Sequence, residues 1–394
     1  MVIKADDMKP SFLCILLALT GCVKADPIEE ITEKVFELSK TQMTLMDLTL
    51  TEDITPRSTN ADGSFRTADK YWWCSGFYPG SLWYTYLYTG DEGIRDLAHK
   101  HTIKLDSVMF VRFDHDLGFQ MNCSYGNALR ITGDKQYEQR MVESARALAS
   151  RYNSNIGTLR SWSHGKWEFP VIIDNMMNLE LLMEGYRLSG DKSLYDIATK
   201  HADTTIEHHF RNDCSCWHLV NYNPVDGRVI AKQTVQGYSD DSAWARGQAW
   251  ALYGYTMMYW KTGLERYLTQ AEKIADMLVS RLPEDGIPYW DFDAPDIPDA
   301  LRDASAGAVM AAAFYRLSRL TEDKNKSDIY YKTADTQVKT LATEEYLAKP
   351  GENHNFLLKH SVGFLKNNSE VDAPLTYADY YFLEALLIRK GIIE

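Results

Sequence analysis

Residues 250–278 read WALYGYTMMYWKTGLERYLTQAEKIADML and contain two helical patterns joined by a short turn. The first pattern, residues 250–260, is apolar and aromatic almost all round, which is typical of a buried helix. The second pattern, residues 267–278, is apolar on one side only, which is typical of a surface helix. Gly263 between them suits the left-handed conformation that closes a helix. The stretch therefore predicts an antiparallel helix pair with an inner and an outer member.

The same turn recurs along the chain, each time between two helical patterns. The copies are Tyr88-Thr89-Gly90-Asp91, Ile131-Thr132-Gly133-Asp134, Leu188-Ser189-Gly190-Asp191, Lys261-Thr262-Gly263-Leu264 and a degraded copy, Leu320-Thr321-Glu322-Asp323. An Asp after the turn can cap the next helix by accepting its free backbone N–H groups. Each copy therefore predicts one helix pair.

Five such pairs, plus a pair formed by helices near residues 28–48 and 379–389, would close into a ring of six. This pattern predicts an all-α fold, the (α/α)6 toroid or six-hairpin barrel, with a cleft at one end. An open helical solenoid is the alternative that such repeats also build. The long, aromatic-rich connection at residues 281–302 favours the toroid, because it is typical of a wall around a pocket.

The composition of the 394-residue chain is that of a globular protein with a sizeable core, with 45% hydrophobic and 25% charged residues. The net charge is -13, and the isoelectric point is near 5.3. Nucleic acid is an unsuitable partner for such a chain, because phosphate binding requires a basic surface. Any anionic ligand must be held by a few local cations.

The N-terminal segment has the pattern of an export signal. Residues 12–19 form an apolar run too short to span a bilayer but suited to the core of a signal peptide. The run ends in Leu19-Thr20-Gly21-Cys22, which resembles a bacterial lipoprotein cleavage box with Cys22 as the lipidated residue. We expect residues 1–22 to be a lipoprotein-type signal peptide and residues 23–394 a single domain. The protein would be periplasmic or lipid-anchored to the bacterial envelope, with a soluble secreted protein as the alternative.

No metal or cofactor motif stands out. Four cysteines remain beyond the signal, and their spacing fits no zinc site: Cys74, Cys123, Cys214 and Cys216. We interpret them as buried free thiols, with one long-range disulfide as the alternative. The histidines His201, His208 and His209 lack the helical spacing of a zinc site. Because phosphate-binding loops and nucleophile elbows are also missing from the sequence, we expect no metal, nucleotide or other cofactor.

Acidic residues begin most of the predicted inner helices, whose ends converge on one rim of a toroid. They are Asp116, Asp174, Asp240, Asp241, Asp303 and Asp379. Taken singly, each is most simply a helix cap. Crowded carboxylates cannot all stay ionised, however, and one with a raised pKa can act as a general acid. Asp174 is the best candidate, because its sequence neighbours are apolar and an Asp116 carboxylate nearby would favour its protonated form.

Arg246 lies one turn into an otherwise apolar helix and therefore needs an anionic partner. The partner is either a sugar carboxylate, which an arginine can grip with two hydrogen bonds, or an internal carboxylate of Asp240 or Asp241. His218 could donate to the same sugar carboxylate, or it could be a satisfied core histidine.

Several stretches in this order resemble the family 88 glycoside hydrolases, the unsaturated glucuronyl hydrolases, over nearly the whole mature chain. They are Trp73-Cys74-Ser75-Gly76-Phe77-Tyr78-Pro79-Gly80, His115-Asp116-Leu117-Gly118-Phe119, Ile172-Ile173-Asp174-Asn175-Met176-Met177-Asn178, Gln236 to Gln248, Pro288-Tyr289-Trp290-Asp291-Phe292 and Asp379-Tyr380-Tyr381-Phe382-Leu383-Glu384-Ala385. One departure is Ala378, where the family usually has Gly.

The resemblance implies that Asp174 is the catalytic acid and base and that Asp116 is its carboxylate partner. It implies substrate-binding roles for His115, His218, Gln236, Arg246, Trp73, Trp250, Trp162 and His360. In the family, the uronate subsite is formed by the counterparts of His218, Gln236 and Arg246, and aromatic rings form its platforms.

The activity that the resemblance implies is release of the non-reducing-end 4,5-unsaturated uronic acid from lyase-generated glycosaminoglycan oligosaccharides. The reaction would begin with protonation of C4 and continue with addition of water at C5. The enzyme alternatives are an unsaturated rhamnogalacturonyl hydrolase acting on pectin fragments and a sugar 2-epimerase on the same toroid. The third alternative is a non-catalytic glycan-binding lipoprotein.

Overall fold

The computed structural model describes residues 26–52 and 54–394. The predicted signal peptide, residues 1–22 with Cys22, lies outside the described residues and stays a prediction. None of the helices in the described ranges combines the length and apolar character needed to cross a bilayer.

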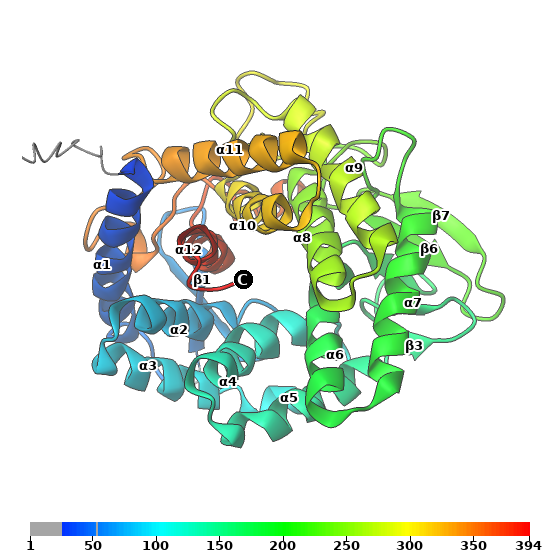
Figure 1. Cartoon of the computed structure of the whole chain (residues 1–394), viewed down its shortest axis with the longest axis horizontal. Coiled ribbons are helices and arrows are strands. Elements are labelled where there is room, and N and C mark those ends of the chain that lie inside the picture. The colour runs from blue at the N-terminus through cyan, green and yellow to red at the C-terminus, as the bar shows by residue number, and fades with distance from the viewer. Residues whose placement is uncertain (1–25, 53) are drawn as a thin grey trace, which may run out of the picture.

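The α-helices of the described chain form two concentric rings (Figure 1). The inner ring consists of α2 (Phe77–Thr89), α4 (Asn127–Thr132), α6 (Asn175–Ser189), α8 (Ala245–Thr262), α10 (Ala304–Leu320) and α12 (Thr376–Lys390). A π-helical stretch, Gly118–Gly126, extends α4 at its N-terminus. Neighbouring inner helices contact one another, and α12 contacts α2. The ring is therefore closed, which confirms the predicted toroid over the open solenoid.

The outer ring consists of α1 (Pro27–Asp47), α3 (Glu92–Ile103), α5 (Glu138–Ala149), α7 (Lys192–His209), α9 (Glu265–Arg281) and α11 (Lys324–Leu341). Helices α8 and α9 illustrate the division between the rings. Every residue of α8 from Ala245 to Met258 is buried, whereas the buried residues of α9 follow a helical period. The inner helix is enclosed on all sides, and the outer helix packs through one face, as predicted.

The repeated turns have the conformation that the sequence predicts. The glycines Gly90, Gly133, Gly190 and Gly263 all have φ between 66° and 72°, a left-handed conformation that glycine adopts without strain. Asp91, for example, accepts a hydrogen bond from the Ile94 N–H at 3.2 Å and so caps α3. In the degraded copy, Asp323 still caps α11 although no glycine precedes it.

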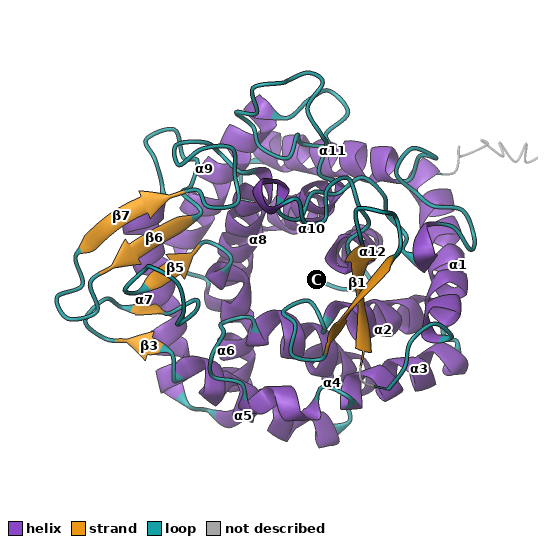
Figure 2. Cartoon of the chain, turned by 180° about the vertical axis from the view of Figure 1, so that it is seen from behind, coloured by secondary structure: helices purple, strands orange, loops and turns teal. Residues whose placement is uncertain are grey.

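Three small antiparallel sheets, which the sequence did not predict, lie in the connections between helices. Their strands are β1 (Ile54–Thr59) with β2 (Phe65–Asp69), β3 (Tyr152–Asn153) with β4 (Thr158–Leu159), and β5 (Pro170–Ile172) with β6 (Leu219–Tyr222) and β7 (Val229–Gln233). The hairpin of β1 and β2 lies over one end of the ring, and β5 to β7 lie at its edge (Figure 2). These sheets build walls at the end where the inner helices begin.

Short helical turns complete the connections: η1 (Asp106–Phe110), η3 (Lys135–Tyr137), η4 (Asn353–Asn355) and η5 (Leu365–Asn367).

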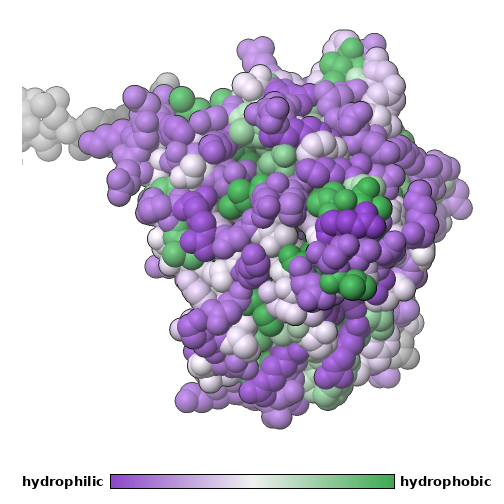
Figure 3. All heavy atoms as spheres, turned by 90° about the vertical axis from the view of Figure 1, so that its right-hand side faces the viewer, coloured by the Kyte–Doolittle hydropathy of each residue, from purple (hydrophilic) through white to green (hydrophobic). Residues whose placement is uncertain are grey.

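All four cysteines of the described chain are free thiols, so the alternative of a long-range disulfide is wrong. The face that carries β6 and β7 is mostly hydrophilic, with small scattered apolar areas (Figure 3). Such scattered exposure is ordinary for a globular surface.

Candidate active site

A cavity of about 330 Å³ opens at the end of the toroid where the inner helices begin. Seven of the residues predicted from the sequence line it: Trp73, His115, Asp116, Trp162, Asp174, Gln236 and Arg246. The lining also contains residues that sequence reasoning missed: Arg57, Trp72, Asp114, Phe119, Ile172, Gly363, Phe364, Asn367, Ser369, Glu370 and Tyr377. Residues from both ends of the chain thus meet in one cavity.

Asp174 is the last residue before α6, directly after β5. Its side chain does not cap the helix, and its Oδ2 atom is buried without a hydrogen-bond partner. Burial among apolar neighbours raises the pKa of Asp174 to about 7, and the positive charge of Arg246 opposes this rise. Asp174 is therefore a carboxyl group that is partly protonated near neutral pH and faces a cavity.

Asp116 reaches the same cavity from the segment before the π-helical stretch. Gly118 lets this segment approach α6, because a Cβ atom there would lie 2.4 Å from the Cα of Asn178. The Asn178 amide lies 3.5 Å from Asp116 Oδ1. Burial and the charge of Asp114 raise the pKa of Asp116 well above its usual range. The sequence predicts that an Asp116 charge keeps Asp174 protonated, but the main cause of the raised pKa of Asp174 is burial, and the pKa of Asp116 is itself raised.

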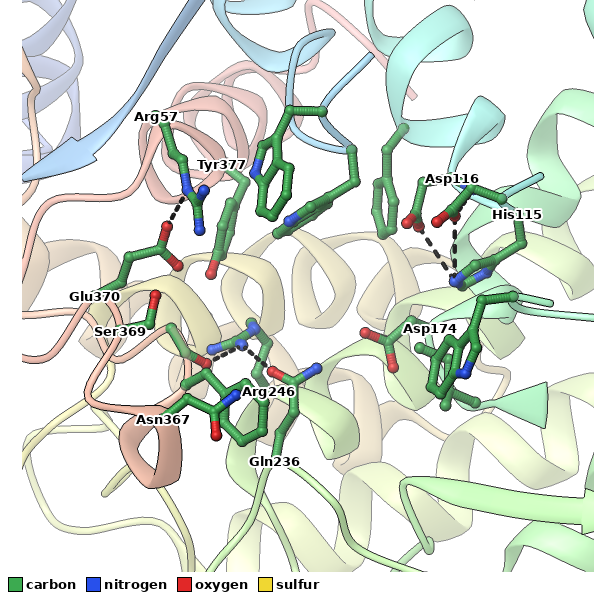
Figure 4. A pocket seen from close by; sticks show the side chains of 18 residues that line it. Arg57, His115, Asp116, Asp174, Gln236, Arg246, Asn367, Ser369, Glu370 and Tyr377 are labelled. Atoms are coloured by element: carbon green, nitrogen blue, oxygen red, sulfur yellow. Dashed lines mark hydrogen bonds and ion pairs between the residues drawn. The ribbon is translucent and has the colours of Figure 1, made fainter. Parts of the chain in front are cut away.

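His115 lies beside these carboxyl groups. Its side chain is buried, and burial lowers the pKa of His115 to about 4, so the imidazole is neutral. The Nε2 atom lies 3.5 Å from Asp116 Oδ1 and 4.0 Å from Asp114 Oδ1 (Figure 4). His115 therefore adds a neutral polar surface to the acidic wall.

Arg246 projects from the first turn of α8, and neither predicted internal partner contacts it. Asp240 and Asp241 are exposed, because their loop turns outward before α8 begins. The buried internal partner is instead Asp303, whose Oδ2 lies 3.3 Å from Arg246 Nη1.

The Arg246 guanidinium also holds the loop at residues 362–363 in place. It donates to the backbone carbonyls of Val362 and Gly363 and, at 3.1 Å, to Gln236 Oε1. Arg246 thus lines the cavity and fixes the 362–363 segment at once.

The other rim aspartates do not line the cavity. Asp303 caps α10 through the N–H groups of Ser305 and Ala306. Asp379 accepts hydrogen bonds from the backbone N–H groups of Leu357 and Leu358. The interpretation as a helix cap is therefore correct for Asp303 and wrong for Asp379, whose partners belong to a distant segment, and for Asp240 and Asp241, which precede the N-cap residue Trp244 of α8. Of the six aspartates, Asp116 and Asp174 line the cavity.

Three predicted substrate-binding residues lie outside the cavity lining. Trp250 is 1% exposed and packs against the rings of Phe119 and Tyr381. Its side chain lies near the Asp174 carboxyl group and slightly opposes the rise in the pKa of Asp174. The inner-ring position of α8 buries Trp250 too deeply for it to serve as an open ring platform.

His218 lies behind Asp174, with its Nε2 atom 3.7 Å from Asp174 Oδ2. It is 2% exposed, and burial lowers the pKa of His218 to about 3. His360 lies outside the lining because its Nδ1 is paired with Asp372 Oδ1 at 2.7 Å. His218 is therefore buried beside Asp174, whereas His360 and Asp372 form an exposed pair outside the cavity.

The wall opposite Asp174 carries charges that are already paired. Arg57 on β1 places its Nε atom 2.5 Å from Glu370 Oε1 and its guanidinium over the Trp72 ring. Ser369 accepts a hydrogen bond from Arg66 at 3.1 Å. Figure 4 shows Arg57 and Glu370 on one side of the cavity and Asp116 and Asp174 on the other. The Arg57–Glu370 pair spans 313 positions, so no local sequence signal could have revealed it.

The polar atoms of Asp114, His115 and Asp116 lie within 4.8 Å of one another, close enough to surround a cation. The expectation that the enzyme needs no metal stays a prediction.

A cavity at the mouth of an (α/α)6 toroid that combines aromatic walls, protonatable carboxyl groups and an arginine is suited to binding and cleaving an acidic sugar. Among curated proteins, the chain is 45% identical over 326 residues to an unsaturated glucuronyl hydrolase of Formosa agariphila, covering 82% of this chain and 80% of that protein. The chain therefore belongs to the unsaturated glucuronyl hydrolases and is a glycosidase. It is also 32% identical over 338 residues to an unsaturated chondroitin disaccharide hydrolase of Streptococcus pneumoniae, covering 84% and 85% of the two chains.

Solved structures agree with this membership. The crystal structure of an unsaturated glucuronyl hydrolase specific for heparin matches with a TM-score of 0.90 and 45% identity, covering 92% of this chain and 98% of that chain. A variant of the Streptococcus agalactiae enzyme, in complex with dGlcA-GalNAc6S, matches with a TM-score of 0.80 and 28% identity over 92% of each chain. A scan against protein-family models found no match. The membership decides for the predicted enzyme over the rhamnogalacturonyl hydrolase, epimerase and non-catalytic alternatives.

Proposed function

We propose that this enzyme removes the non-reducing-end 4,5-unsaturated uronic acid from lyase-generated glycosaminoglycan fragments by hydrating the C4–C5 double bond. The observation that carries the proposal is the Asp174 carboxyl group, which faces the cavity, has an unpartnered oxygen and has a pKa near 7. The names of the relatives, which refer to unsaturated glucuronyl and chondroitin substrates, support the substrate class.

The double bond of such a substrate is part of an enol ether, so it is more easily protonated than an ordinary alkene. Asp174 gives its proton to C4, and the positive charge that develops at C5 is shared with the ring oxygen. The Asp174 carboxylate then takes a proton from a water molecule as that water adds to C5. The hemiketal that results opens, releasing the shortened sugar and a keto acid. Since one carboxyl group serves both steps, the spacing rule for paired carboxylates in ordinary glycosidases does not apply.

The neighbouring residues complete the uronate subsite in this proposal. A neutral Asp116 and the neutral imidazole of His115 hydrogen-bond to ring hydroxyl groups without repelling the substrate carboxylate. Arg246 supplies the positive charge that attracts this carboxylate, and the Gln236 amide donates beside it. The aromatic faces of Trp73 and Trp162 line the cavity and can pack against the sugar ring.

Residues behind the cavity wall support the acid in this proposal. His218 and Trp250 lie near the Asp174 carboxyl group and fix its orientation. His360 acts through Asp372, because this ion pair closes the base of the loop that brings residues 363–370 to the cavity.

The next sugar of the substrate is expected against the opposite wall. This wall offers Arg57, Asn367, Ser369 and Glu370, which are donors and acceptors suited to hydroxyl or sulfate groups. The neighbouring structures named for heparin and for a 6-sulfated galactosamine disaccharide make sulfated fragments reasonable first substrates to test.

Export with a lipid anchor is a further part of the proposal and depends on the pattern at residues 12–22 alone. Expression with radiolabelled palmitate in a bacterial host tests it. Label should be incorporated into the full chain and lost from a Cys22→Ser variant. Incorporation that is unchanged in Cys22→Ser would contradict the anchor.

The activity is tested with lyase-made disaccharides of chondroitin, hyaluronan and heparin. Loss of the ultraviolet absorbance of the conjugated double bond reports each turnover. We expect the absorbance to fall for at least one disaccharide and the fall to stop in Asp174→Asn. A protein that binds these sugars and leaves the absorbance constant would be a binding protein, and the proposed function would be wrong.

A further inference from the structure

Asp114 lies next to Asp116 and lines the same cavity, and neither the sequence patterns nor the family resemblance gave it a role. We propose that Asp114 is a positioning residue that keeps Asp116 neutral and correctly oriented for the substrate. The inference depends on the proposed function, because a neutral Asp116 matters only if the cavity binds an anionic uronate.

The first argument is the rigid geometry of this segment. Asp114 Oδ1 accepts a hydrogen bond from the backbone N–H of Asp116 at 3.0 Å. The backbone of Asp114 forms a bridge with Trp162, and the N–H of His115 donates to the Ser161 carbonyl at 3.1 Å. The Asp114 carboxyl group is therefore held beside the backbone of Asp116.

Arg151, at the end of α5, braces this segment from behind. It is 8% exposed and donates to the carbonyls of Arg112 and Ser161. Because its guanidinium is used by backbone carbonyls, Arg151 forms no ion pair with either carboxyl group. Among the described residues, the basic side chain within 4.0 Å of the Asp114 and Asp116 oxygens is that of His115, which is neutral. The positive charge of Arg151 acts on both carboxyl groups from a greater distance.

The second argument is the unequal exposure of the pair. The Asp114 side chain is 33% exposed, whereas that of Asp116 is 15% exposed. Two adjacent carboxyl groups share one proton more easily than they carry two negative charges, and the less solvated member takes the proton. The hydroxyl of Asp116 then donates to the Asp114 carboxylate. The high pKa of Asp116, caused first by burial and then by the charge and hydrogen bond of Asp114, agrees with this assignment.

The other titratable groups around the pair do not reverse the assignment of the proton to Asp116. His115 is neutral, since burial lowers its pKa to about 4. Asp174, across the cavity at the start of α6, raises the pKa of Asp116 further when it is ionised. The Cys74 thiol is buried and its pKa is raised, so it stays uncharged. The surroundings thus favour a single negative charge on the pair of Asp114 and Asp116, located on Asp114, the more exposed member.

The test compares Asp114→Asn with wild type by pH profiles of kcat/KM on an unsaturated chondroitin disaccharide. Asparagine keeps an oxygen for the Asp116 N–H but removes the charge. In the proposal, the free enzyme binds the uronate with both Asp116 and Asp174 protonated, so a lower pKa of Asp116 moves the alkaline limb of kcat/KM to lower pH. We expect a shift of about one pH unit, the lower end of the effect of a like charge at this distance. The control is Asp96→Asn, an exposed charge outside the cavity, which should leave the limb unchanged.

A spectroscopic readout makes the test independent of activity. Carbon-13 labelling of aspartate carboxyl groups, with Asp116→Asn to assign the resonance, follows the titration of Asp116 directly. In Asp114→Asn this titration should move to lower pH by a similar amount. An unmoved limb together with an unmoved resonance would overturn the inference, and so would a uniform loss of kcat/KM at every pH, which indicates a structural role.

Failure of this inference is distinguishable from failure of the proposed function. Activity that persists in Asp174→Asn would refute the proposed mechanism, whatever Asp114 does. An inactive Asp174→Asn combined with an unmoved limb in Asp114→Asn would refute the role of Asp114 alone.

Discussion

The starts of α6 and α12 place similar aspartates in different surroundings. Asp174 and Asp379 are both buried, and burial raises the pKa of each to about 7. Both oxygens of Asp379 accept backbone hydrogen bonds, from Leu357 at 2.9 Å and from Leu358 at 2.8 Å. The Oδ2 atom of Asp174 has no partner, and Asp174 lines the cavity. A raised pKa alone therefore does not identify the acid, whereas a raised pKa with an uncommitted oxygen facing a cavity does.

The difference arises from what the connections place over each helix start. At α12, the segment before residue 360 packs over the carboxyl group and uses both of its oxygens. Asp174 immediately precedes α6 and lines the cavity, whereas Asp379 lies within the first turn of α12. The two carboxyl groups therefore differ both in helix position and in what the connecting loops place over them.

The largest expected effect is that of Asp174→Asn. The variant keeps the size of the side chain but loses the proton, so kcat should fall by about 1,000-fold, within the usual range for a general acid. Ultraviolet assays measure kcat, and calorimetry measures substrate binding, which should change by less than about fivefold. If Asp174→Asn retained a tenth of the wild-type kcat, Asp174 would not be the catalytic acid, and it would no longer differ in function from Asp379.

Arg246→Ala should have the next largest effect. It removes the positive charge that attracts the substrate carboxylate, an interaction worth about 2 to 3 kcal/mol, so kcat/KM should fall roughly 100-fold, mainly through KM. Arg146→Ala, an exposed arginine paired within its own helix, is the matched control. A loss confined to kcat, with unchanged KM, would contradict a role in binding the uronate.

The pH dependence of kcat should follow Asp174. Its protonated form is the active one, so activity is full below the pKa of about 7 and falls tenfold per pH unit above it. Asp379→Asn should leave this limb in place, because the Asp379 carboxyl group is remote from the reaction. A limb that disappears in Asp379→Asn would reverse the assignment of the two aspartates.

Glu370→Gln tests the cavity wall opposite Asp174, where the charges of Arg57 and Glu370 are paired. Removing this carboxylate leaves Arg57 and Arg66 without their anionic partner. The ratio of kcat/KM for a 6-sulfated over an unsulfated disaccharide should rise by about fivefold, the value of a partly exposed ion pair near 1 kcal/mol. Glu344→Gln, an exposed residue, serves as control. An unchanged ratio would show that these arginines do not face the substrate.

Asp379→Asn should have the smallest effect on activity, with kcat within threefold of wild type. The substitution should instead lower stability, because the NH₂ group of asparagine cannot accept a hydrogen bond and leaves one buried backbone N–H, of Leu357 or Leu358, unpaired. The free energy of unfolding should decrease by about 1 to 3 kcal/mol in urea titrations. A stable variant with strongly reduced kcat would mean that Asp379 contributes to the chemistry.

The sequence predicted the toroid because its evidence is local. Each Gly and Asp of the repeated turn reports its own helix pair, and the inner and outer helices differ in their apolar patterns. Asp174 was also visible, since its neighbours in the sequence are apolar. These predictions required no knowledge of distant contacts.

The missed features all depend on distant segments meeting. The Arg246 partner is Asp303, 57 positions away, and not the nearby Asp240. Arg57 and Glu370 meet only when the β1 hairpin and the C-terminal loop close over the same mouth. The burial of the His218 and Trp250 side chains depends on how tightly the inner and outer rings of helices pack together. A pattern read along one chain gives no measure of such depth or pairing.

Proton nuclear magnetic resonance of the product formed in D₂O tests most directly whether Asp174 protonates the double bond. We predict that, in the first turnovers, wild type places one deuterium stereospecifically at C4 of the released uronate, and that Asp174→Asn forms no such product above background. Release of a uronic acid that still carries its double bond and no deuterium at C4 would mean that the enzyme cleaves the glycosidic bond directly, and would contradict the account.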